Sequence, residues 1–273
     1  MGTVPISLVL PALLPLWRVG YQCEDNMITI HSYEQGKRSE ACTEYLKAAL
    51  HHDQVERIIL LPIPTTRDKR TVLNTNVCIN DVLDEVVSGT VISGYGLDEA
   101  FTVGAQRRGG RVIDLERDEE FLGENAQLTA MCTLGILLGS IDRSLKDLTV
   151  GVVGYGRIGR RLINMLLYLG AGVRVFTSRE GTRVDLSEYG VASAASSVNA
   201  DLGGLDILIN TAPAPIFPPE GIPKGLRIID LASGDNFHGI EVEKYPSVPA
   251  RMFPVSAGRA WGRAVERFIS DTT

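Results

Sequence analysis

A short glycine motif in the middle of the chain constrains its fold more than any other feature. Gly154, Gly156 and Gly159 form a G-x-G-x-x-G pattern that follows the β-branched run Thr149–Val153 and opens an amphipathic segment, Arg157–Leu169. In a βαβ unit the first glycine permits a tight turn, the second lets backbone N–H groups approach a pyrophosphate, and the third lets helix and strand pack closely. The N-terminus of the helix adds partial positive charge. The motif therefore predicts a Rossmann unit that binds a dinucleotide. The residues expected to hold it here are Gly154, Gly156, Arg157, Ile158 and Gly159.

The end of the next predicted strand, Val173–Thr177, indicates which dinucleotide is bound. An NAD site usually places Asp or Glu there, where the carboxylate accepts from the ribose 2′-hydroxyl and would repel a 2′-phosphate. In this sequence the strand continues into Ser178 and Arg179, and Glu180 comes one position too late. Thr177 and Ser178 can donate to phosphate oxygens, and the guanidinium of Arg179 can pair with phosphate charge. The predicted cofactor is NADP.

Two later strand ends complete the predicted cofactor site. The runs Asp206–Asn210 and Arg227–Leu231 are apolar and are followed by turn residues. In open parallel sheets, ligands lie outside the carboxyl ends of the strands. The residues expected to flank the ribose and the nicotinamide are Thr211, Ala212, Pro213, Leu231, Ala232 and Ser233.

The order of elements predicts an α/β fold with two parallel-sheet domains. Strand-like and helical runs alternate along both halves, and such alternation is typical of parallel sheets with helical crossovers. We expect a smaller flavodoxin-like N-terminal domain, residues 1–122, that binds the substrate, and a C-terminal Rossmann domain, residues 123–273, that binds NADP. The last helix could pack back on the first domain. The predicted strands are Met27–Ser32, Arg57–Leu61, Thr90–Ser93, Arg111–Leu115, Thr149–Val153, Val173–Thr177, Asp206–Asn210 and Arg227–Leu231; the predicted helices are Glu40–His51, Ala100–Arg108, Asn125–Ile141, Arg157–Leu169 and Ala257–Ser270.

Charge and cysteine content exclude two classes of function. The chain has 33 acidic against 27 basic residues, a net charge of −6. It therefore lacks the broad basic surface that nucleic-acid binding needs. The four cysteines are scattered, without a C-x-x-C pair or a histidine at metal-ligand spacing. We expect neither a nucleic-acid partner nor a metal site.

The longest early apolar run, Ile6–Trp17, does not predict a membrane span. It contains about twelve residues and is interrupted by Pro11 and Pro15, whereas a spanning helix needs about 20 apolar residues. No Lys or Arg precedes it, as a secretory signal would require. We expect a buried first element in a cytoplasmic protein without membrane attachment, with a signal peptide as the alternative.

Seven motifs in order make the chain resemble the dipicolinate synthase A family. They are IILLPIPTTRD (Ile58–Asp68), VISGYG (Val91–Gly96), DLERDE (Asp114–Glu119), the Gly154–Gly159 loop, INTAPAPIF (Ile209–Phe217), IIDLAS (Ile228–Ser233) and VPARMFPVSAG (Val248–Gly258). This family is built like the D-2-hydroxyacid dehydrogenases and makes the spore compound dipicolinate with NADP. The resemblance implies NADP-dependent oxidation of dihydrodipicolinate, or of its hydroxytetrahydro form, during sporulation. It also implies a flavoprotein-like partner, dipicolinate synthase B, and we expect a homodimer.

The chain departs from the family at three places. Nothing in Met1–Trp17 reproduces the Gly-Gly-Asp turn with which the family opens. The family stretch Thr-Ala-Glu-Gly is replaced by Thr129–Cys132, so that Met131 stands where the carboxylate is usual, and Ala250 replaces a glycine. The cofactor domain therefore carries over from the family more securely than the activity does.

A cyclic dicarboxylate substrate would need clamps for its carboxylates and a base for a ring proton. Arg67 and Arg251 are the predicted clamps, and Asp118, with Glu116 as the alternative, is the predicted base. The further residues expected at the substrate are Ser256, Thr65, Thr66 and Gly94. The four histidines (His31, His51, His52 and His238) are predicted to lie at the surface or to cap elements.

Two other functions compete with this interpretation. A D-2-hydroxyacid dehydrogenase would need an Arg shortly after the fifth strand and a late His, but Ser233-Gly234 follows that strand and no His follows His238. A non-catalytic NADP-binding scaffold or regulatory protein would also fit the three departures from the family.

Overall fold

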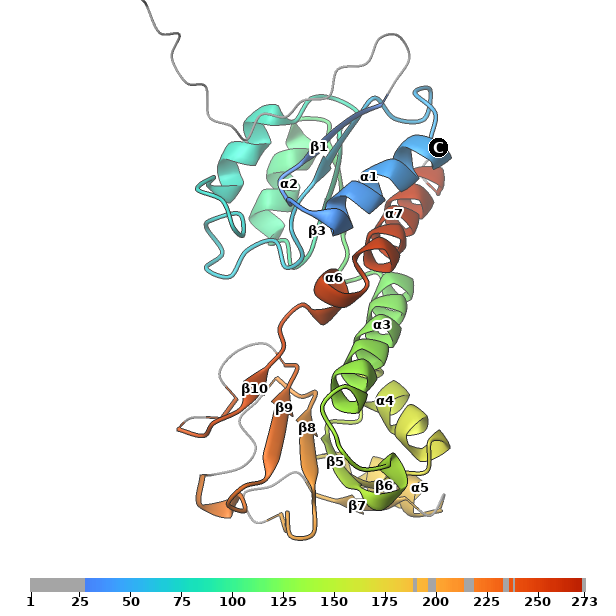
Figure 1. The fold of residues 1–273 in the computed structure, drawn as a ribbon. Coiled ribbons are helices and arrows are strands. Elements are labelled where there is room, and N and C mark those ends of the chain that lie inside the picture. Colours follow the sequence, from blue (N-terminus) through green and yellow to red (C-terminus); the bar gives the residue numbers. More distant parts are fainter. Residues whose placement is uncertain are drawn as a thin grey trace, which may run out of the picture.

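The computed structural model describes residues 28–188, 191–195, 200–213, 219–232, 236–237 and 239–271. Expectations for Met1–Trp17, for Ser233 and for His238 lie outside these residues. Two parallel sheets form two units, one above the other, and long helices connect them (Figure 1). This arrangement confirms the predicted α/β class.

The first unit contains a four-stranded parallel sheet whose strands follow one another in sequence order. Its elements are β1 (Thr29–Ser32), α1 (Lys37–Ala49), β2 (Arg57–Leu60), the 3₁₀ helix η1 (Ile79–Glu85), β3 (Val91–Gly94), α2 (Glu99–Arg107) and β4 (Arg111–Asp114). The order β1-β2-β3-β4 differs from the flavodoxin order 2-1-3-4-5. In this unit no strand lies beyond β1 among the described residues, so β1 is an edge strand.

The crossovers of this sheet use both of its faces. Successive side chains of a strand point to opposite faces: Ile58 packs with Leu46 of α1, whereas Ile59 packs with Val82 of η1 and Phe101 of α2. All three crossovers move the chain in the same direction across the sheet, so the one through α1 has the opposite hand to the other two. The connections leaving β1 and β2 therefore diverge, and a crevice is expected between their carboxyl ends.

The second unit has the Rossmann strand order. Its elements are η2 (Leu145–Asp147), β5 (Thr149–Val153), α4 (Arg157–Tyr168), β6 (Gly172–Phe176), α5 (Glu180–Glu188), β7 (Ala192–Ala194), β8 (Ile207–Asn210), η3 (Pro219–Gly221), β9 (Arg227–Asp230) and β10 (Glu243–Lys244). The sheet order β7-β6-β5-β8-β9-β10 is the 3-2-1-4-5-6 order of dinucleotide-binding folds.

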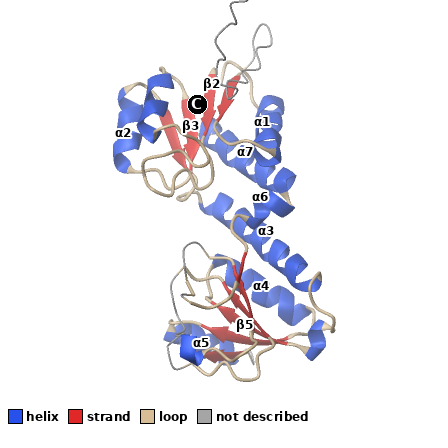
Figure 2. Cartoon of the chain, turned by 60° about the vertical axis from the view of Figure 1, so that its left-hand side comes forward, coloured by secondary structure: helices blue, strands red, loops and turns tan. Residues whose placement is uncertain are grey.

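Three helices join the units (Figures 1 and 2). α3 (Glu119–Leu138) leaves the first unit and packs against α4 of the second, so the expected boundary at residue 122 falls inside this helix. α6 (Val248–Met252) and α7 (Pro254–Ser270) return the chain, and α7 packs against α1. A Cβ on Gly258 would lie 2.2 Å from the Arg38 carbonyl oxygen, so only glycine permits this approach. Trp261 is fully buried, and its indole N–H donates to Ser93 Oγ at 2.8 Å.

Chain connectivity shows that the carboxyl ends of both sheets face the junction of the units. β4 ends at Asp114, and α3 begins there with Glu119. β10 ends at Lys244, and α6 follows from Val248, where it contacts α3 and α7. Because all strands within each sheet are parallel, both sets of carboxyl-end loops lie on the side of this junction.

One described helix, α3, is long and apolar enough to cross a membrane by length and composition alone. It packs against α4, α6 and α7. These are the contacts of a connecting helix inside a folded protein.

Candidate dinucleotide site

The glycine loop has the geometry of a phosphate-binding turn. Gly154 has φ +93°, which favours glycine, and a Cβ on Gly159 would lie 2.1 Å from the Gly154 carbonyl oxygen. Thr211 holds the turn from the neighbouring strand end, because its hydroxyl donates to the Val153 carbonyl at 2.8 Å. A Cβ on Gly156, by contrast, would meet no atom of the described residues within 4 Å. The space in front of Gly156 is therefore open to a ligand.

The helix that starts at this loop has a free N-terminus. Gly156 is the N-cap of α4, and no side chain in the described part of the chain caps the helix. The first backbone N–H groups of a helix lack partners inside it, so an anion placed there gains both hydrogen bonds and the favourable helix dipole. A dinucleotide pyrophosphate fits these donors and the open space at Gly156.

Arg157, the first residue of α4, is held by the other unit. Its guanidinium donates to both carboxylate oxygens of Glu119, at 2.5 and 2.8 Å. This hydrogen-bonded ion pair lowers the pKa of Glu119 and raises that of Arg157. In this structure the side chain expected to bind phosphate is thus paired across the junction, with the first residue of α3.

This pairing predicts that Glu119 weakens dinucleotide binding. In the wild type the Glu119 carboxylate competes with a phosphate for the guanidinium of Arg157. Glu119→Gln removes this carboxylate, so affinity for NADP should rise about two- to five-fold, the range of an exposed ion pair. The gain should shrink as salt is added. Glu120→Gln is the matched control, since Glu120 pairs with Arg267. Calorimetric titration measures the effect, and unchanged or weaker binding to Glu119→Gln would contradict it.

The end of β6 carries hydroxyl and guanidinium groups and no carboxylate. Thr177 is buried, and its Oγ1 accepts from the Arg179 backbone N–H at 3.3 Å. Ser178 and Arg179 are exposed, and the Arg179 guanidinium has no partner among the described residues. Arg183 reaches back from α5 to donate to the Thr177 carbonyl at 2.9 Å. This strand end fits a phosphorylated ribose.

A buried polar network supports the loops that follow β8 and β9, which lie on the opposite side of β5 from β6. This network was not predicted from the sequence. Asn210 and Asp230 are each 1% exposed, and the Asn210 amide donates to Asp230 Oδ1 at 2.9 Å. Asn236 donates to the same carboxylate, at 3.3 Å to Oδ2. A buried carboxylate needs such donors. The signal in the sequence is a single polar residue ending each of two apolar strands, ILIN and RIID.

The network fixes the residues that were predicted to flank the nicotinamide. The Ala212 backbone N–H donates to Asn210 Oδ1 at 3.1 Å, and that of Ala232 donates to Asp230 Oδ1 at 3.2 Å. The Leu231 N–H donates to the Asn210 carbonyl at 3.0 Å. Pro213 is exposed beyond Ala212. The structure thus brings both loops to one edge, next to the glycine loop that Thr211 contacts.

The predicted substrate residues of the first unit follow β2 and end β3. Thr65 is fully buried, and its Oγ1 accepts from the Tyr95 backbone N–H at 2.8 Å. The same oxygen would lie 2.8 Å from a Cβ on Gly94. Thr65 and Gly94 therefore pack the loop after β2 closely against the end of β3. Thr66 accepts from the Lys69 N–H, and Arg67 is exposed without a partner among the described residues. Of this group, Arg67 has the side chain most available to a ligand.

Asp118 has the surroundings of a structural residue. Its Oδ1 accepts from the Phe121 N–H at 2.8 Å, which makes Asp118 the N-cap of α3. Both of its oxygens also accept from Arg267 of α7, at 3.0 and 3.1 Å. These contacts favour a role in joining α3 to α7 over the predicted role as a base.

Arg251 and Ser256 lie where α6 meets α7, between the two units (Figure 1). Both are exposed and have no hydrogen-bond partner among the described residues. Arg251 is close enough to Tyr245 to lower its pKa, although burial and the hydrogen bond to Glu243 raise that pKa overall. Arg67 therefore belongs to the first unit, whereas Arg251 belongs to the connecting helix α6.

Tyr95 is a further residue of the junction that the sequence reasoning did not select. It follows β3 and is partly buried. Burial raises the pKa of its hydroxyl, and so do the charges of Glu116 and Asp114, while Arg157 of the glycine loop acts in the opposite direction. Its hydroxyl stays protonated near neutral pH and can donate a hydrogen bond in the junction.

The fold and the site together define a two-sheet α/β protein with a Rossmann-type dehydrogenase fold. Comparison with known proteins narrows this class. The chain is 27% identical to dipicolinate synthase A of Bacillus subtilis over 233 residues, which cover 78% of this chain and 77% of the relative. This similarity confirms the resemblance that the sequence motifs indicated. No protein-family model matches the chain.

Solved structures agree with the fold. Dipicolinate synthase A from Bacillus halodurans superposes with a TM-score of 0.66 at 22% identity, covering 80% of this chain and 81% of that chain. A transhydrogenase from Sinorhizobium meliloti gives a TM-score of 0.57 at 19% identity, covering 79% and 74%. At these identities the likeness shows a shared fold.

Proposed function

We propose that this chain is an NADP-dependent oxidoreductase of the dipicolinate synthase type. One observation supports NADP as the cofactor. An open glycine loop lies beside a strand end that offers Thr177, Ser178 and Arg179 and no carboxylate. The similarity to dipicolinate synthase A supports the substrate class, a cyclic dicarboxylate.

The proposed reaction oxidises dihydrodipicolinate to dipicolinate. Bound NADP⁺ would accept the hydride that a ring carbon loses, and a second ring position would lose a proton, so that the products would be dipicolinate, NADPH and H⁺. The cofactor supplies the hydride chemistry, so this chain has to bind, orient and shield the substrate. Because the product ring is aromatic, the proton is lost more easily, and a strong protein base is not required.

Arg251 provides a test of substrate binding. In Arg251→Ala the loss of a charge-assisted hydrogen bond to a substrate carboxylate should lower kcat/KM about ten- to hundred-fold. Binding of NADP should not change. Steady-state assays and cofactor titrations measure the two effects separately, and unchanged turnover would remove Arg251 from the substrate site.

The decisive experiment for the function is an assay of NADPH formation. Purified chain is supplied with dihydrodipicolinate and NADP⁺, with and without the flavoprotein-like dipicolinate synthase B that the resemblance implies. Absorbance of NADPH should rise in at least one of the two mixtures. A panel of lactate- and glycerate-type substrates separates this activity from that of a D-2-hydroxyacid dehydrogenase.

A second candidate is an NADP-binding protein without catalysis of its own. It is favoured by the engagement of Asp118 as a helix cap and ion-pair partner, and by Met131 at the position of the family carboxylate. This candidate predicts tight NADP binding and no NADPH formation in either mixture.

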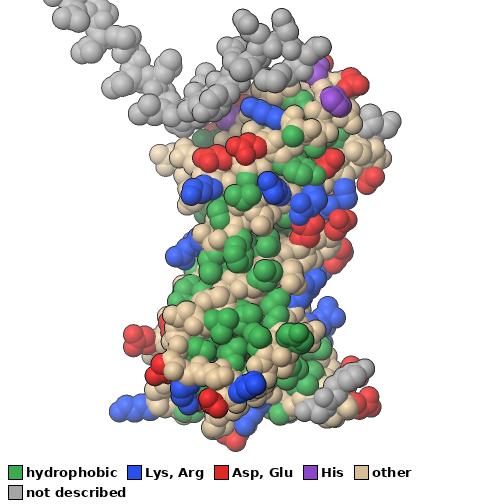
Figure 3. Space-filling model, turned by 45° about the vertical axis from the view of Figure 1, so that its right-hand side comes forward, with side chains coloured by type: hydrophobic (Ala, Val, Ile, Leu, Met, Phe, Trp, Pro, Cys, Tyr) green, Lys and Arg blue, Asp and Glu red, His purple; other side chains and the backbone are tan. Residues whose placement is uncertain are grey.

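The proposal includes a homodimer formed through α3. Hydrophobic side chains gather over the middle and lower part of one face of the molecule (Figure 3). Exposed apolar residues on α3 are Met131 and Leu138, and Met252 and Val255 of α6 and α7 are exposed as well. The Met252 methyl lies near α3, 3.4 Å from where a Cβ on Gly135 would stand. An exposed apolar surface of this kind is typical of an interaction site.

Leu138→Glu, at an exposed apolar position of α3, tests this interface. A charge on the apolar face of α3 should convert the dimer into a monomer, because an unpaired carboxylate would be buried between the two copies. Light scattering coupled to gel filtration gives the mass. Val103→Glu, on α2 away from this surface, is the control. A wild-type monomer would contradict the prediction.

A further inference from the structure

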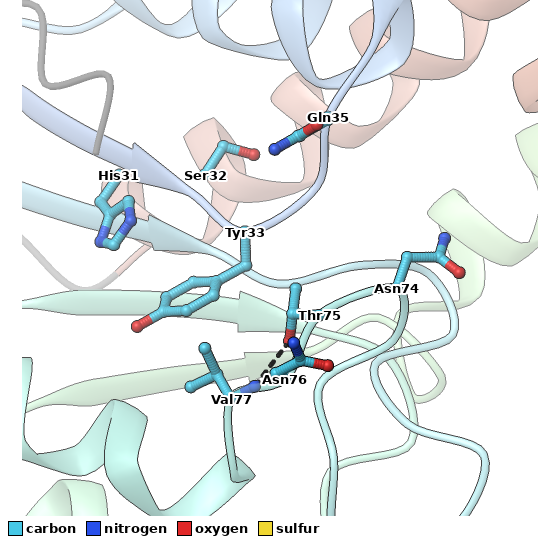
Figure 4. Close-up of a pocket in the computed structure, with 8 residues that line it drawn as sticks. All are labelled: His31, Ser32, Tyr33, Gln35, Asn74, Thr75, Asn76 and Val77. Atoms are coloured by element: carbon cyan, nitrogen blue, oxygen red, sulfur yellow. Dashed lines mark hydrogen bonds between the residues drawn. The ribbon is translucent and has the colours of Figure 1, made fainter. Parts of the chain in front are cut away.

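A cavity of about 340 Å³ lies in the first unit, at the carboxyl end of the edge strand β1 (Figure 4). One wall comes from residues that end or follow β1, and the other from the loop that follows β2. The residues that line it are His31, Ser32, Tyr33, Gln35, Asn74, Thr75, Asn76 and Val77. Its volume falls within the range of small-molecule sites, about 300–1,000 Å³, near the lower limit.

The topology of the sheet explains why a cavity forms here. The connections leaving β1 and β2 turn to opposite faces, since α1 and η1 pack on different sides. In open α/β sheets, ligands bind in the crevice at such a switch point. At the glycine loop, Arg157 pairs with Glu119, the first residue of α3, and α3 follows β4. In the four-stranded sheet β4 is the edge strand opposite to β1, three strand spacings or about 14 Å from it. The cavity is therefore a place separate from the predicted phosphate site.

One of the lining residues is a histidine held by a carboxylate. His31 Nδ1 lies 2.6 Å from Glu85 Oε2, and the Tyr33 hydroxyl donates to Glu85 Oε1, also at 2.6 Å. The His31 and Tyr33 rings are in contact, with centroids 4.6 Å apart. Contrary to the surface or capping role predicted from sequence, His31 is partly buried in this cluster. With Nδ1 committed to Glu85, Nε2 is the nitrogen left for a ligand.

The rim of the cavity offers uncommitted amides. Gln35, Asn74 and Asn76 line it, and their carboxamides have no hydrogen-bond partner among the described residues. The hydroxyls of Ser32 and Thr75, in contrast, donate to backbone carbonyls of their own loops. No Lys, Arg, Asp or Glu is among the described residues that line the cavity. The available groups are thus neutral, and each carboxamide presents a donor beside an acceptor.

We propose that this cavity binds a neutral nucleoside. A carboxamide is complementary to the donor–acceptor edge of a purine, three such groups line the cavity, and the Tyr33 and Val77 side chains add apolar surface. An anionic ligand would find no fixed cation among the lining residues that the structure describes. The site does not depend on the function proposed above.

Adenosine is the probe, and calorimetry in the presence of saturating NADPH is the measurement. NADPH occupies any adenine pocket beside the glycine loop, so the remaining binding reports on the cavity. We expect one adenosine per chain, with affinity reduced at least tenfold in Gln35→Val and in Asn76→Val. Both side chains are exposed, and circular dichroism verifies that the variants fold. Gln106→Ala, an exposed carboxamide on α2 outside the cavity, should bind as the wild type does.

Three results would overturn the proposal: no adenosine binding, adenosine binding abolished by NADPH, or equal binding by wild type and both rim variants. Tighter binding of glucose or of dipicolinate in the same cavity would overturn the assignment to a nucleoside. Failure of NADPH itself to bind would refute the proposed function, while the adenosine titration without NADPH would still compare wild type with the rim variants.

Discussion

Gly159→Ala should abolish dinucleotide binding, with an affinity loss of at least 100-fold. The added Cβ would lie 2.1 Å from the Gly154 carbonyl oxygen and 3.1 Å from its carbon, and both are backbone atoms that cannot rotate away. Either the turn or the first turn of α4 must shift, and the amides that face the pyrophosphate would shift with it. Overpacking of this kind also destabilises a protein by about 1–3 kcal/mol. Fluorescence titration with NADPH and a thermal melt measure the two effects.

Gly156→Ala separates binding from folding at the same loop. A Cβ there meets no atom within 4 Å among the residues that the structure describes, so the melting temperature should stay close to that of the wild type. The methyl group would instead occupy space needed by the pyrophosphate, and affinity should fall about tenfold or more. If Gly159→Ala bound NADPH as tightly as the wild type, or if Gly156→Ala did, the assignment of this loop as the phosphate site would be wrong.

Arg179→Ala should weaken NADPH binding about 10- to 100-fold and leave NADH binding unchanged. The exposed guanidinium has no partner among the described residues, so its removal breaks no contact that the structure describes. Its proposed role is a charge-assisted interaction with the 2′-phosphate, a group that only NADPH carries. Parallel titrations with the two nucleotides give the ratio of affinities, and the NADPH effect should diminish at high salt.

Lys224→Ala is the control for Arg179→Ala, because it removes an exposed positive charge from the same unit at a loop before β9. It should leave both affinities unchanged. An equal loss for NADPH and NADH in Arg179→Ala would indicate a general effect on the fold or on the pyrophosphate. Tighter binding of NADH than of NADPH by the wild type would refute the NADP assignment itself.

The elements that sequence predicts best are those with a strong local signal. β5 spans Thr149–Val153 and α4 begins at Arg157, as the β-branched run and the glycines indicated. α3, however, begins at Glu119, six residues before the predicted start, because Asp118 caps it. Several elements were missed because they are short or lack an apolar period; they are η1, η2, α5, β7, η3, β10 and α6.

In the candidate site, too, the features set by residues close in sequence could be predicted, and those set by distant residues could not. The glycine turn can be predicted from the chain because its geometry follows from three residues close in sequence and from the absence of side chains on them. The role of Asp118 cannot be predicted in this way, since Arg267, which occupies its carboxylate, is 149 residues away. The same holds for Arg157, which pairs with Glu119 across the junction, and for Asn210, which donates to Asp230.

Local patterns of polarity, branching and glycine thus determined the α/β class, the position of the nucleotide turn and the chemistry at the end of β6. The tertiary structure alone decided which charges are free and which are paired. It also decided that the final helix packs on α1, and that a cavity opens beside β1. These properties depend on distances between side chains far apart in the chain, and such distances exist only once the two sheets and their connecting helices have packed.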